Sequence, residues 1–238
     1  MSRVAVVTGA ARGIGSAIAA RLEADGFTVA RLNRTPLSEN EFRFDLGDLA
    51  THQPAIDAVM EKFGRIDCLV NNAGIASPKR GDFMELAAET FDMVMNVNLR
   101  GTVFLTQAVA KAMLAAPADA RRSVQFITSV SSTHASPERL DYCMSKAGLG
   151  MFAKGLALRL ARERIDVFEV RPGIIKTDMT AGVTAKYDAL IEGGLVPEGR
   201  WGLPEDVAAV CVALASGALP FSTGSVIDAG GGLHIPKL

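Results

Sequence analysis

The sequence predicts an α/β fold in which helices cover both faces of a parallel sheet. Short runs rich in β-branched residues alternate with longer segments of helical period, and this alternation is typical of a doubly wound parallel sheet. The predicted strands are VAVVT, TVARL, CLV, VQFIT, DVFEV and SVID. Right-handed crossovers would place their carboxyl ends along one edge of the sheet, where a ligand crevice is expected.

The helices are predicted from apolar residues that recur at steps of three and four. The segments with this period are Gly15 to Asp25, Ala50 to Phe63, Glu89 to Ala115, Asp141 to Arg164 and Pro204 to Ser216. Between TVARL and the next apolar stretch, FRFDL, only about eight residues remain, which is short for a crossover helix. We therefore expect the helix between the second and third strands to be missing.

Composition indicates one globular domain. The 238 residues are 49% hydrophobic and 21% charged, with a formal net charge of -1. Such a chain has no strong field to attract nucleic acid or an anionic membrane. Its apolar runs are shorter than a bilayer span, and MSRVAVVTGA enters the first strand without a signal-peptide pattern. We therefore expect a cytoplasmic protein with a single domain over residues 1–238 and no nucleic-acid or membrane partner.

Neither a metal site nor a disulfide framework is predicted. The cysteines are odd in number and lack a paired CxxC spacing, and the histidines form no cluster with metal-ligand spacing. These residues are Cys68, Cys143, Cys211, His52, His134 and His234.

Residues 178–203 look less regular than their surroundings. They contain glycine, proline and polar residues just after a predicted strand, where a loop can close over a ligand. We predict a substrate-loop flap in this segment, and an insertion without function is the alternative.

The stretch VAVVTGAARGIGSAIAARL combines a strand, a glycine-rich turn and an amphipathic helix in the order that binds a diphosphate. The glycines permit close backbone approach, and the helix start offers unpaired N–H groups to an anion. A purely structural turn is the alternative. The predicted cofactor contacts are Gly9, Arg12, Gly13, Ile14 and Gly15.

The end of the second strand selects the nucleotide. A carboxylate there would bind the adenosine ribose and repel a 2′-phosphate, but this chain has Asn33 and Arg34. Arg34 and Arg12 could bind that phosphate through charge-assisted hydrogen bonds, which favours NADP(H) over NAD(H). Alternatively, Arg34 is a solvated surface charge. Asp45, followed by Leu46, could accept a hydrogen bond from the adenine amino group or could cap the next turn.

Tyr142 and Lys146 lie four residues apart in a predicted helix and therefore on one face. An ordinary phenol has a pKa near ~10, and a neighbouring cation is expected to lower it. Ser129, at the end of a predicted strand, would polarise a carbonyl that Tyr142 protonates. Asn98 lies inside a helical segment, where its amide could open the helix ladder, order a water and extend a proton relay from Lys146. A buried structural amide is the alternative.

Together, the motifs TGAARGIG, NNAG, VNLRG, YCMSK and RPGIIKTDM, with Ser129, resemble the short-chain dehydrogenase/reductase family over nearly the whole chain. Within the family, the resemblance is strongest to 3-oxoacyl-carrier-protein reductases. It implies a Rossmann-like sheet of about seven strands and a homotetramer or homodimer formed through the long helices. It also implies a catalytic tetrad of Asn98, Ser129, Tyr142 and Lys146, and further cofactor contacts from Asn72, Ala73, Gly74, Tyr142, Lys146, Pro172, Ile175 and Thr177.

The resulting hypothesis is an oxidoreductase that transfers hydride between NADP(H) and a ketone or secondary alcohol, with NAD(H) as the other possible cofactor. An NAD-dependent polyol or sugar dehydrogenase is the rival enzyme, and a nucleotide-sensing protein without catalysis is the rival from another class. Met and Trp side chains often simply pack, but they are also candidates to line the pocket of this small substrate. The pocket candidates are His134, Met144, Met179 and Trp201.

Overall fold

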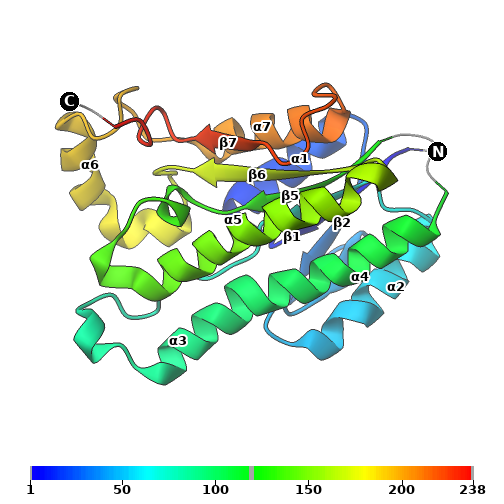
Figure 1. Ribbon diagram of the computed structural model, residues 1–238, viewed down its shortest axis with the longest axis horizontal. Helices are drawn as coiled ribbons and strands as arrows, with labels where there is room; N and C mark the ends of the chain where they lie inside the picture. The colour runs from blue at the N-terminus through cyan, green and yellow to red at the C-terminus, as the bar shows by residue number, and fades with distance from the viewer. Residues whose placement is uncertain (1, 118–120, 237–238) are drawn as a thin grey trace.

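The computed structural model describes residues 2–117 and 121–236, which form one seven-stranded sheet with parallel pairing throughout (Figure 1). The strand order is β3-β2-β1-β4-β5-β6-β7. The strands are β1 (Val4–Thr8), β2 (Thr28–Asn33), β3 (Glu41–Arg43), β4 (Cys68–Asn71), β5 (Arg122–Ile127), β6 (Ile165–Pro172) and β7 (Val226–Ala229). The order reverses between β1 and β4, so the crevice expected of such a sheet lies at their carboxyl ends. The predicted doubly wound fold is confirmed.

Helices cover both faces of the sheet. On one face α1 packs against α7, and on the other lie α2, α4 and α5 (Figure 1). The bounds of these helices are α1 (Gly13–Ala24), α2 (His52–Phe63), α4 (Thr102–Ala115), α5 (Leu140–Leu160) and α7 (Pro204–Ser216). None of the helices in the two described ranges is both long and apolar enough to cross a membrane.

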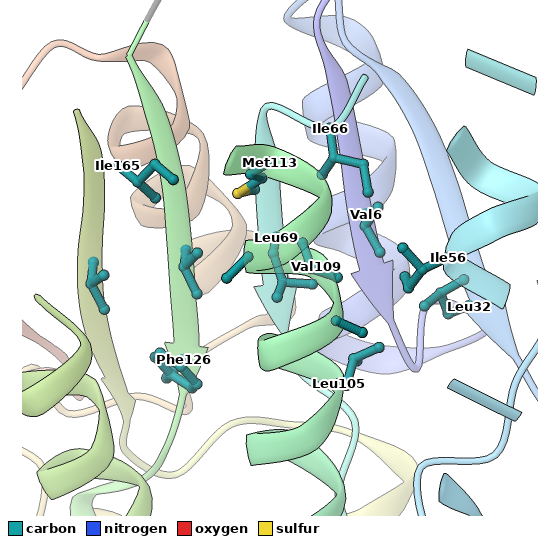
Figure 2. Close-up of a cluster of buried hydrophobic side chains, with 14 of the residues drawn as sticks. Val6, Leu32, Ile56, Ile66, Leu69, Leu105, Val109, Met113, Phe126 and Ile165 are labelled. Atoms are coloured by element: carbon teal, nitrogen blue, oxygen red, sulfur yellow. The ribbon is translucent and has the colours of Figure 1, made fainter. Parts of the chain in front are cut away.

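The core consists of two buried clusters, one on each face of the sheet. Val6 of β1 faces the cluster under α2, α4 and α5, whereas its neighbours Ala5 and Val7 face the cluster under α1 and α7. Successive side chains of a strand point to opposite faces, so a strand buried on both faces must be apolar throughout. Figure 2 shows the first cluster, where Leu105 of α4 and Leu69 of β4 contribute to the same buried layer.

The link between β2 and β3 contains no helix, as predicted. β2 ends at Asn33 and β3 begins at Glu41. The carboxylate of Glu41 closes the link, because its Oε2 accepts hydrogen bonds from the Leu37 N–H at 2.8 Å and from Asn33 Nδ2 at 3.3 Å. The Leu37 bond, followed by the smaller effect of Asn33, holds the pKa of Glu41 below its usual value. A negative charge therefore lies beside the end of β2.

The predicted helix from Glu89 to Ala115 is divided in the structure. It consists of α3 (Ala88–Val94), a π-helical segment (Met95–Gly101) and α4. The apolar period does not reveal the division, because a π turn leaves the residues on either side of it helical. Asn98, at the centre of the π-helical segment, belongs to the site described below.

The segment predicted as a flap contains a helix that the sequence did not indicate. A 3₁₀ turn (Asp178–Val183) leads into α6 (Thr184–Glu192). Ile191 is the one fully buried residue of α6, so the helix lacks the apolar stripe by which helices are recognised in a sequence. Closure of this segment over a ligand stays a prediction.

A buried histidine fixes the loop that follows β3. His52, at the start of α2, is 3% exposed; its Nε2 donates a hydrogen bond to the Leu46 carbonyl at 3.2 Å, and its ring lies 5.0 Å from that of Phe44. A Cβ at Gly101 would overlap the same Leu46 carbonyl oxygen, so the loop also packs closely against the π-helical segment. Burial of the ring lowers the pKa of His52, against smaller opposing effects of the Leu46 and Asp45 carbonyls.

The stability of the protein should fall in mildly acidic solution because of His52. The folded state binds this proton less readily than the unfolded chain, so the contribution is present above the ordinary histidine pKa of about 6.5 and is lost as the pH falls below it. The measurement is the free energy of unfolding in urea from pH 8 to pH 5 for the wild type and for His52→Gln. The wild type should lose stability relative to the variant below about pH 6.5; parallel curves would contradict the assignment.

Candidate functional site

The glycine-rich turn after β1 has the backbone that the sequence predicts. Gly9 and Gly13 have φ angles of 64° and 55°, values that side-chain-bearing residues rarely adopt. A Cβ at Gly15 would overlap the Gly9 carbonyl oxygen, so α1 starts directly against the turn. The first turn of α1 carries no acidic residue, and Arg12 at its N-cap makes no side-chain cap. The N–H groups at this helix start are therefore available to an anion.

The loop after β4 is tied to this turn by Thr8, a residue that the sequence analysis did not single out. The Thr8 hydroxyl oxygen accepts hydrogen bonds from the N–H groups of Asn72 and Ala73 at 3.0 and 2.9 Å. In return, Asn72 Nδ2 donates to the carbonyls of Thr8 and Gly9 at 3.0 and 3.3 Å. A polar residue at the end of an otherwise apolar strand is the signal in VAVVT that marks Thr8.

The segment after β6 completes a cradle around the glycine-rich turn. Thr177 Cγ2 would lie 3.6 Å from a Cβ at Gly13, so Thr177 stands over the turn. Pro172 ends β6, and the buried Ile175 forms an isolated parallel bridge with Gly202. Of the residues that the family resemblance assigned to the cofactor, Asn72, Ala73 and Thr177 lie against the glycine-rich turn. The open helix start with its bare glycine backbone fits a dinucleotide diphosphate.

The residues predicted to select the nucleotide are less closely grouped. Arg34 is exposed, and Arg12, whose side chain is 77% exposed, lies 3.5 Å from Asp178 of the flap. Asn33 is buried, and its amide nitrogen is bonded to Glu41. Asp45 caps the following turn, as one of its two predicted roles required, since its Oδ1 accepts from the Gly47 N–H at 2.9 Å.

Ser129, Tyr142 and Lys146 meet at the carboxyl end of β5. The Ser129 hydroxyl is close enough to the Tyr142 phenol to lower its pKa, and Lys146 Nζ lies 5.7 Å from the centre of the phenol ring. Lys146 is 5% exposed, and its Nζ donates to the Ile127 carbonyl at 3.0 Å. A Cβ at Gly74 would lie 3.6 Å from the same Nζ, so the loop after β4 borders this group.

The expectation that a cation lowers the pKa of Tyr142 is wrong in its net direction. Burial of the phenol raises this pKa and outweighs the opposing effects of the Ser129 hydrogen bond and of Arg139, whose guanidinium lies 5.1 Å from the phenol ring. Burial likewise lowers the pKa of Lys146 to about 8. At neutral pH, Tyr142 is therefore a neutral phenol and Lys146 is predominantly a cation.

Asn98 lies at the centre of the π-helical segment and is fully buried. Its Oδ1 accepts from the Ile75 N–H at 2.8 Å, and its Nδ2 donates to the Ile75 carbonyl at 2.9 Å and to Ser145 Oγ at 3.1 Å. The predicted opening of the helix ladder is present, but the side chain is engaged by protein groups. The water relay from Lys146 stays a prediction.

The predicted pocket residues have separate surroundings. Trp201 packs edge-on against Tyr187 of α6, with ring centres 5.8 Å apart, and its Nε1 donates to Asp188 at 2.7 Å. Met144 lies two residues after Tyr142 and thus on another side of α5, where it is exposed. Its assignment to the pocket is disfavoured. His134 and Met179 are also exposed, and their role in substrate binding stays a prediction.

The described residues include no cluster of side chains that could bind a metal ion. Within residues 2–117 and 121–236, no group of three or more histidine, cysteine or acidic side chains could hold a metal ion. The three cysteines are buried free thiols, and burial raises the pKa of Cys68 to about 12.

A dinucleotide cradle beside a serine, a neutral phenol and a buried ammonium is the arrangement of an NAD(P)-dependent oxidoreductase. Comparison with known families agrees, because a family model described as enoyl-(acyl carrier protein) reductase matches residues 9–234. The chain belongs to the short-chain dehydrogenase/reductase family, which confirms the resemblance seen in its motifs.

Similar proteins include reductases and a polyol dehydrogenase. The chain is 34% identical over 249 residues to 3-oxoacyl-[acyl-carrier-protein] reductase FabG of Thermotoga maritima, covering 98% of each protein. It is 35% identical over 246 residues to D-threitol dehydrogenase of Mycolicibacterium smegmatis, covering 96% of this chain and 92% of that protein. A crystal structure of 3-oxoacyl-[acyl-carrier protein] reductase from Brucella melitensis in complex with NAD has 56% identity and a TM-score of 0.98, covering 100% of this chain and 99% of that chain.

Gly15→Ala should weaken the binding of nicotinamide dinucleotides by at least about tenfold, because the added methyl displaces the turn that faces the diphosphate. The measurement is the Kd of NADH and NADPH from fluorescence titration of the folded variant. Gly155→Ala in α5 is the control, since a Cβ there meets nothing within 4 Å. Unchanged affinity in a folded Gly15→Ala protein would show that the cofactor lies elsewhere.

Proposed function

We propose that the protein reduces a ketone to a secondary alcohol with a nicotinamide dinucleotide held over the glycine-rich turn, in the manner of a 3-oxoacyl reductase. The observation that supports this reaction is that Ser129 and the buried Lys146 both lie close to the Tyr142 phenol. The similarity to 3-oxoacyl-[acyl-carrier-protein] reductases supports the substrate class.

Each polar group of the pair has one task. The Ser129 hydroxyl and the Tyr142 phenol hold the carbonyl oxygen of the substrate, and the phenol transfers its proton to that oxygen. The raised pKa of Tyr142 suits this direction, because the phenol still carries its proton at neutral pH. The bound cofactor supplies the hydride that reaches the carbonyl carbon.

Lys146 stabilises the phenolate that remains after the proton leaves. Its ammonium has three protons, of which one is directed to the Ile127 carbonyl and the others are available to the phenol and to the nicotinamide ribose. The cofactor would be held by residues around the crevice, namely Gly9, Gly13, Gly15, Asn72, Ala73, Pro172, Ile175 and Thr177.

Tyr142→Phe should lower the kcat of ketone reduction by about 10²- to 10⁴-fold, the usual contribution of general acid catalysis. The affinity for the cofactor should change little, because the ring and its packing are kept. The measurement is nicotinamide absorbance with a panel of ketones, together with cofactor titration. Full turnover in the Tyr142→Phe variant would show that another group supplies the proton. A wild-type protein that is inactive on every ketone and alcohol would favour the nucleotide-sensing alternative.

The preference for NADP(H) is a further part of the proposal. Arg34 is exposed at the end of β2 and, in the described part of the chain, makes no ion pair, so its guanidinium is available to a 2′-phosphate. Two observations favour NAD(H) instead. The carboxylate of Glu41 lies beside Asn33 and would repel a phosphate, and the similar structure from Brucella melitensis is in complex with NAD.

Arg34→Asp should decrease the ratio of kcat/KM for NADPH to that for NADH by about ten- to hundredfold. Arg21→Asp, which makes the same charge change in the last turn of α1, is the control. A ratio that does not change in Arg34→Asp would refute the assignment of this arginine to the phosphate.

Polyol oxidation is the second candidate function. The similarity to D-threitol dehydrogenase favours it, and the same Ser129, Tyr142 and Lys146 could accept a proton from an alcohol. This direction needs the phenolate, whose formation is opposed by the raised pKa of Tyr142, so oxidation should increase with pH. Parallel assays with ketones and polyols separate the two functions.

We also propose that the protein forms a homotetramer or homodimer through α5. A cytoplasmic location and the absence of a nucleic-acid or membrane partner stay expectations. Met144, Met151 and Leu158 follow one another at seven-residue steps along α5 and are 43%, 67% and 85% exposed. Such a row forms an apolar stripe on one helix face, as an interface between two helices requires. The partner would be a second copy of this chain.

Met151→Glu should convert the oligomer into a smaller species, because it places a charge in the middle of that stripe. Light scattering after size-exclusion chromatography measures the mass. Leu37→Glu, at an 86% exposed position in the link between β2 and β3, is the control. A wild type that is monomeric at micromolar concentration would contradict the proposed assembly.

A further inference from the structure

A buried ion pair lies beside the segment that carries Ser129. Glu169 of β6 is 2% exposed, and its carboxylate accepts two hydrogen bonds from one guanidinium: Arg171 Nε lies 2.8 Å from Oε1 and Arg171 Nη2 lies 3.0 Å from Oε2. A carboxylate at this depth needs such a partner to stay ionised. The reaction proposed above has no use for either charge.

One side of this carboxylate contacts the segment that carries Ser129. Thr128 Oγ1 donates to Glu169 Oε1 at 2.7 Å. Ser132 Oγ lies 3.4 Å from the same oxygen, and it donates its proton to the Ser129 carbonyl at the shorter distance of 2.6 Å. The Ser132 N–H also donates to that carbonyl, at 2.9 Å. The residues on both sides of Ser129 are therefore in contact with Glu169.

The other side of the carboxylate faces α5. A Cβ at Gly150 would lie 3.0 and 3.1 Å from the two oxygens of Glu169, which is tighter than ordinary contact, so a glycine is needed for this approach. Gly150 follows Lys146 by four residues and shares its helix face. Glu169 thus touches both the segment of Ser129 and the face of α5 that carries Tyr142 and Lys146.

We propose that Glu169 is a positioning residue, which sets the separation between Ser129 and the Tyr142–Lys146 face of α5 through Thr128 on one side and Gly150 on the other. This inference rests on the proposed function, since it assigns Ser129 and Tyr142 to one substrate oxygen. Reacting groups must be held to within fractions of an ångström, and a displacement of about 1 Å can cost 10²-fold in rate.

A change in the contacts of Glu169 with Thr128 and Gly150 should also alter the pKa of Tyr142. The Ser129 hydrogen bond is the largest effect that opposes burial in setting the pKa of Tyr142. The charged and titratable groups near the phenol are Arg139, Lys146, Arg80 and Cys143. Within the described residues, the side-chain partners of Glu169 are instead Thr128, Ser132 and Arg171. A displaced Ser129 should therefore raise the pKa of Tyr142 further and move the pH dependence of alcohol oxidation to higher pH.

The test compares two alanines in the same helix. Gly150→Ala pushes a methyl against the carboxylate, whereas Gly155→Ala, five residues further along α5, meets nothing within 4 Å. We expect Gly150→Ala to lower the kcat of ketone reduction by about tenfold with an unchanged cofactor Kd, and to shift the pH profile of oxidation upward. Gly155→Ala should match the wild type in all three measurements, provided that light scattering gives both proteins the same mass, because Gly155 lies one turn from Met151 on the proposed interface face of α5.

Two further variants keep the test independent of folding. Glu169→Gln retains an acceptor for Thr128 but loses the ion pair with Arg171, and it should give the same fall in kcat and the same shift of the pH profile. Glu169→Asp shortens the side chain by one methylene, so the double variant with Gly150→Ala should recover part of the activity that Gly150→Ala loses.

Equal kcat and pH profiles in Gly150→Ala, Glu169→Gln and Gly155→Ala would overturn the inference and leave Glu169 as part of the core only. A fall in melting temperature without a change in these two quantities would overturn it in the same way. Tyr142→Phe separates this outcome from a failure of the proposed function: an active Tyr142→Phe variant refutes the proposed reaction, whereas an inactive one with a normal Gly150→Ala variant refutes the role of Glu169 alone.

Discussion

A positive charge buried at the end of β5 is the constraint on which the site depends. A buried ammonium needs a hydrogen-bond partner, and the Nζ of Lys146 donates to the Ile127 carbonyl at 3.0 Å. Burial lowers its pKa to about 8, which still leaves the ammonium largely charged at neutral pH. Lys146 thus lies where the end of β5, the loop at Gly74 and one face of α5 meet. Tyr142, on the same face of α5, is therefore held beside the Lys146 ammonium.

Glu169 is a second buried charge, of opposite sign, that is paired with Arg171. Buried ion pairs contribute little net stability compared with apolar packing, because desolvation of the charges offsets their attraction. What Glu169 and Arg171 provide is a defined arrangement, since a buried carboxylate accepts only a few geometries of Thr128 and Gly150. The segment that carries Ser129 is thus bonded to Lys146 through the Ile127 carbonyl and to Glu169 through Thr128.

The adenosine end of the crevice is set by the missing helix. Without that helix, β3 starts eight residues after β2 ends, at Glu41 and Asn33 respectively, and the Glu41 carboxylate reaches the end of β2. The region therefore carries an exposed cation at Arg34 and a partly buried anion at Glu41. In the proposed function, Arg34 would attract a 2′-phosphate and Glu41 would repel it, so these two charges act in opposite directions on the preference for NADP(H).

Local spacing and periodicity were sufficient for much of this protein. Residues close in sequence form the glycine-rich turn, the short link after Asn33 and the shared helix face of Tyr142 and Lys146, so these features, like the alternation of strands and helices, could be predicted. The fold was needed for the direction of the Tyr142 pKa, the bonds of Asn98 to Ile75 and the contact of Glu169 with Gly150. These properties depend on burial and on pairs of residues about twenty or more positions apart, such as the 23 between Ile75 and Asn98, and no local pattern specifies which distant groups will meet.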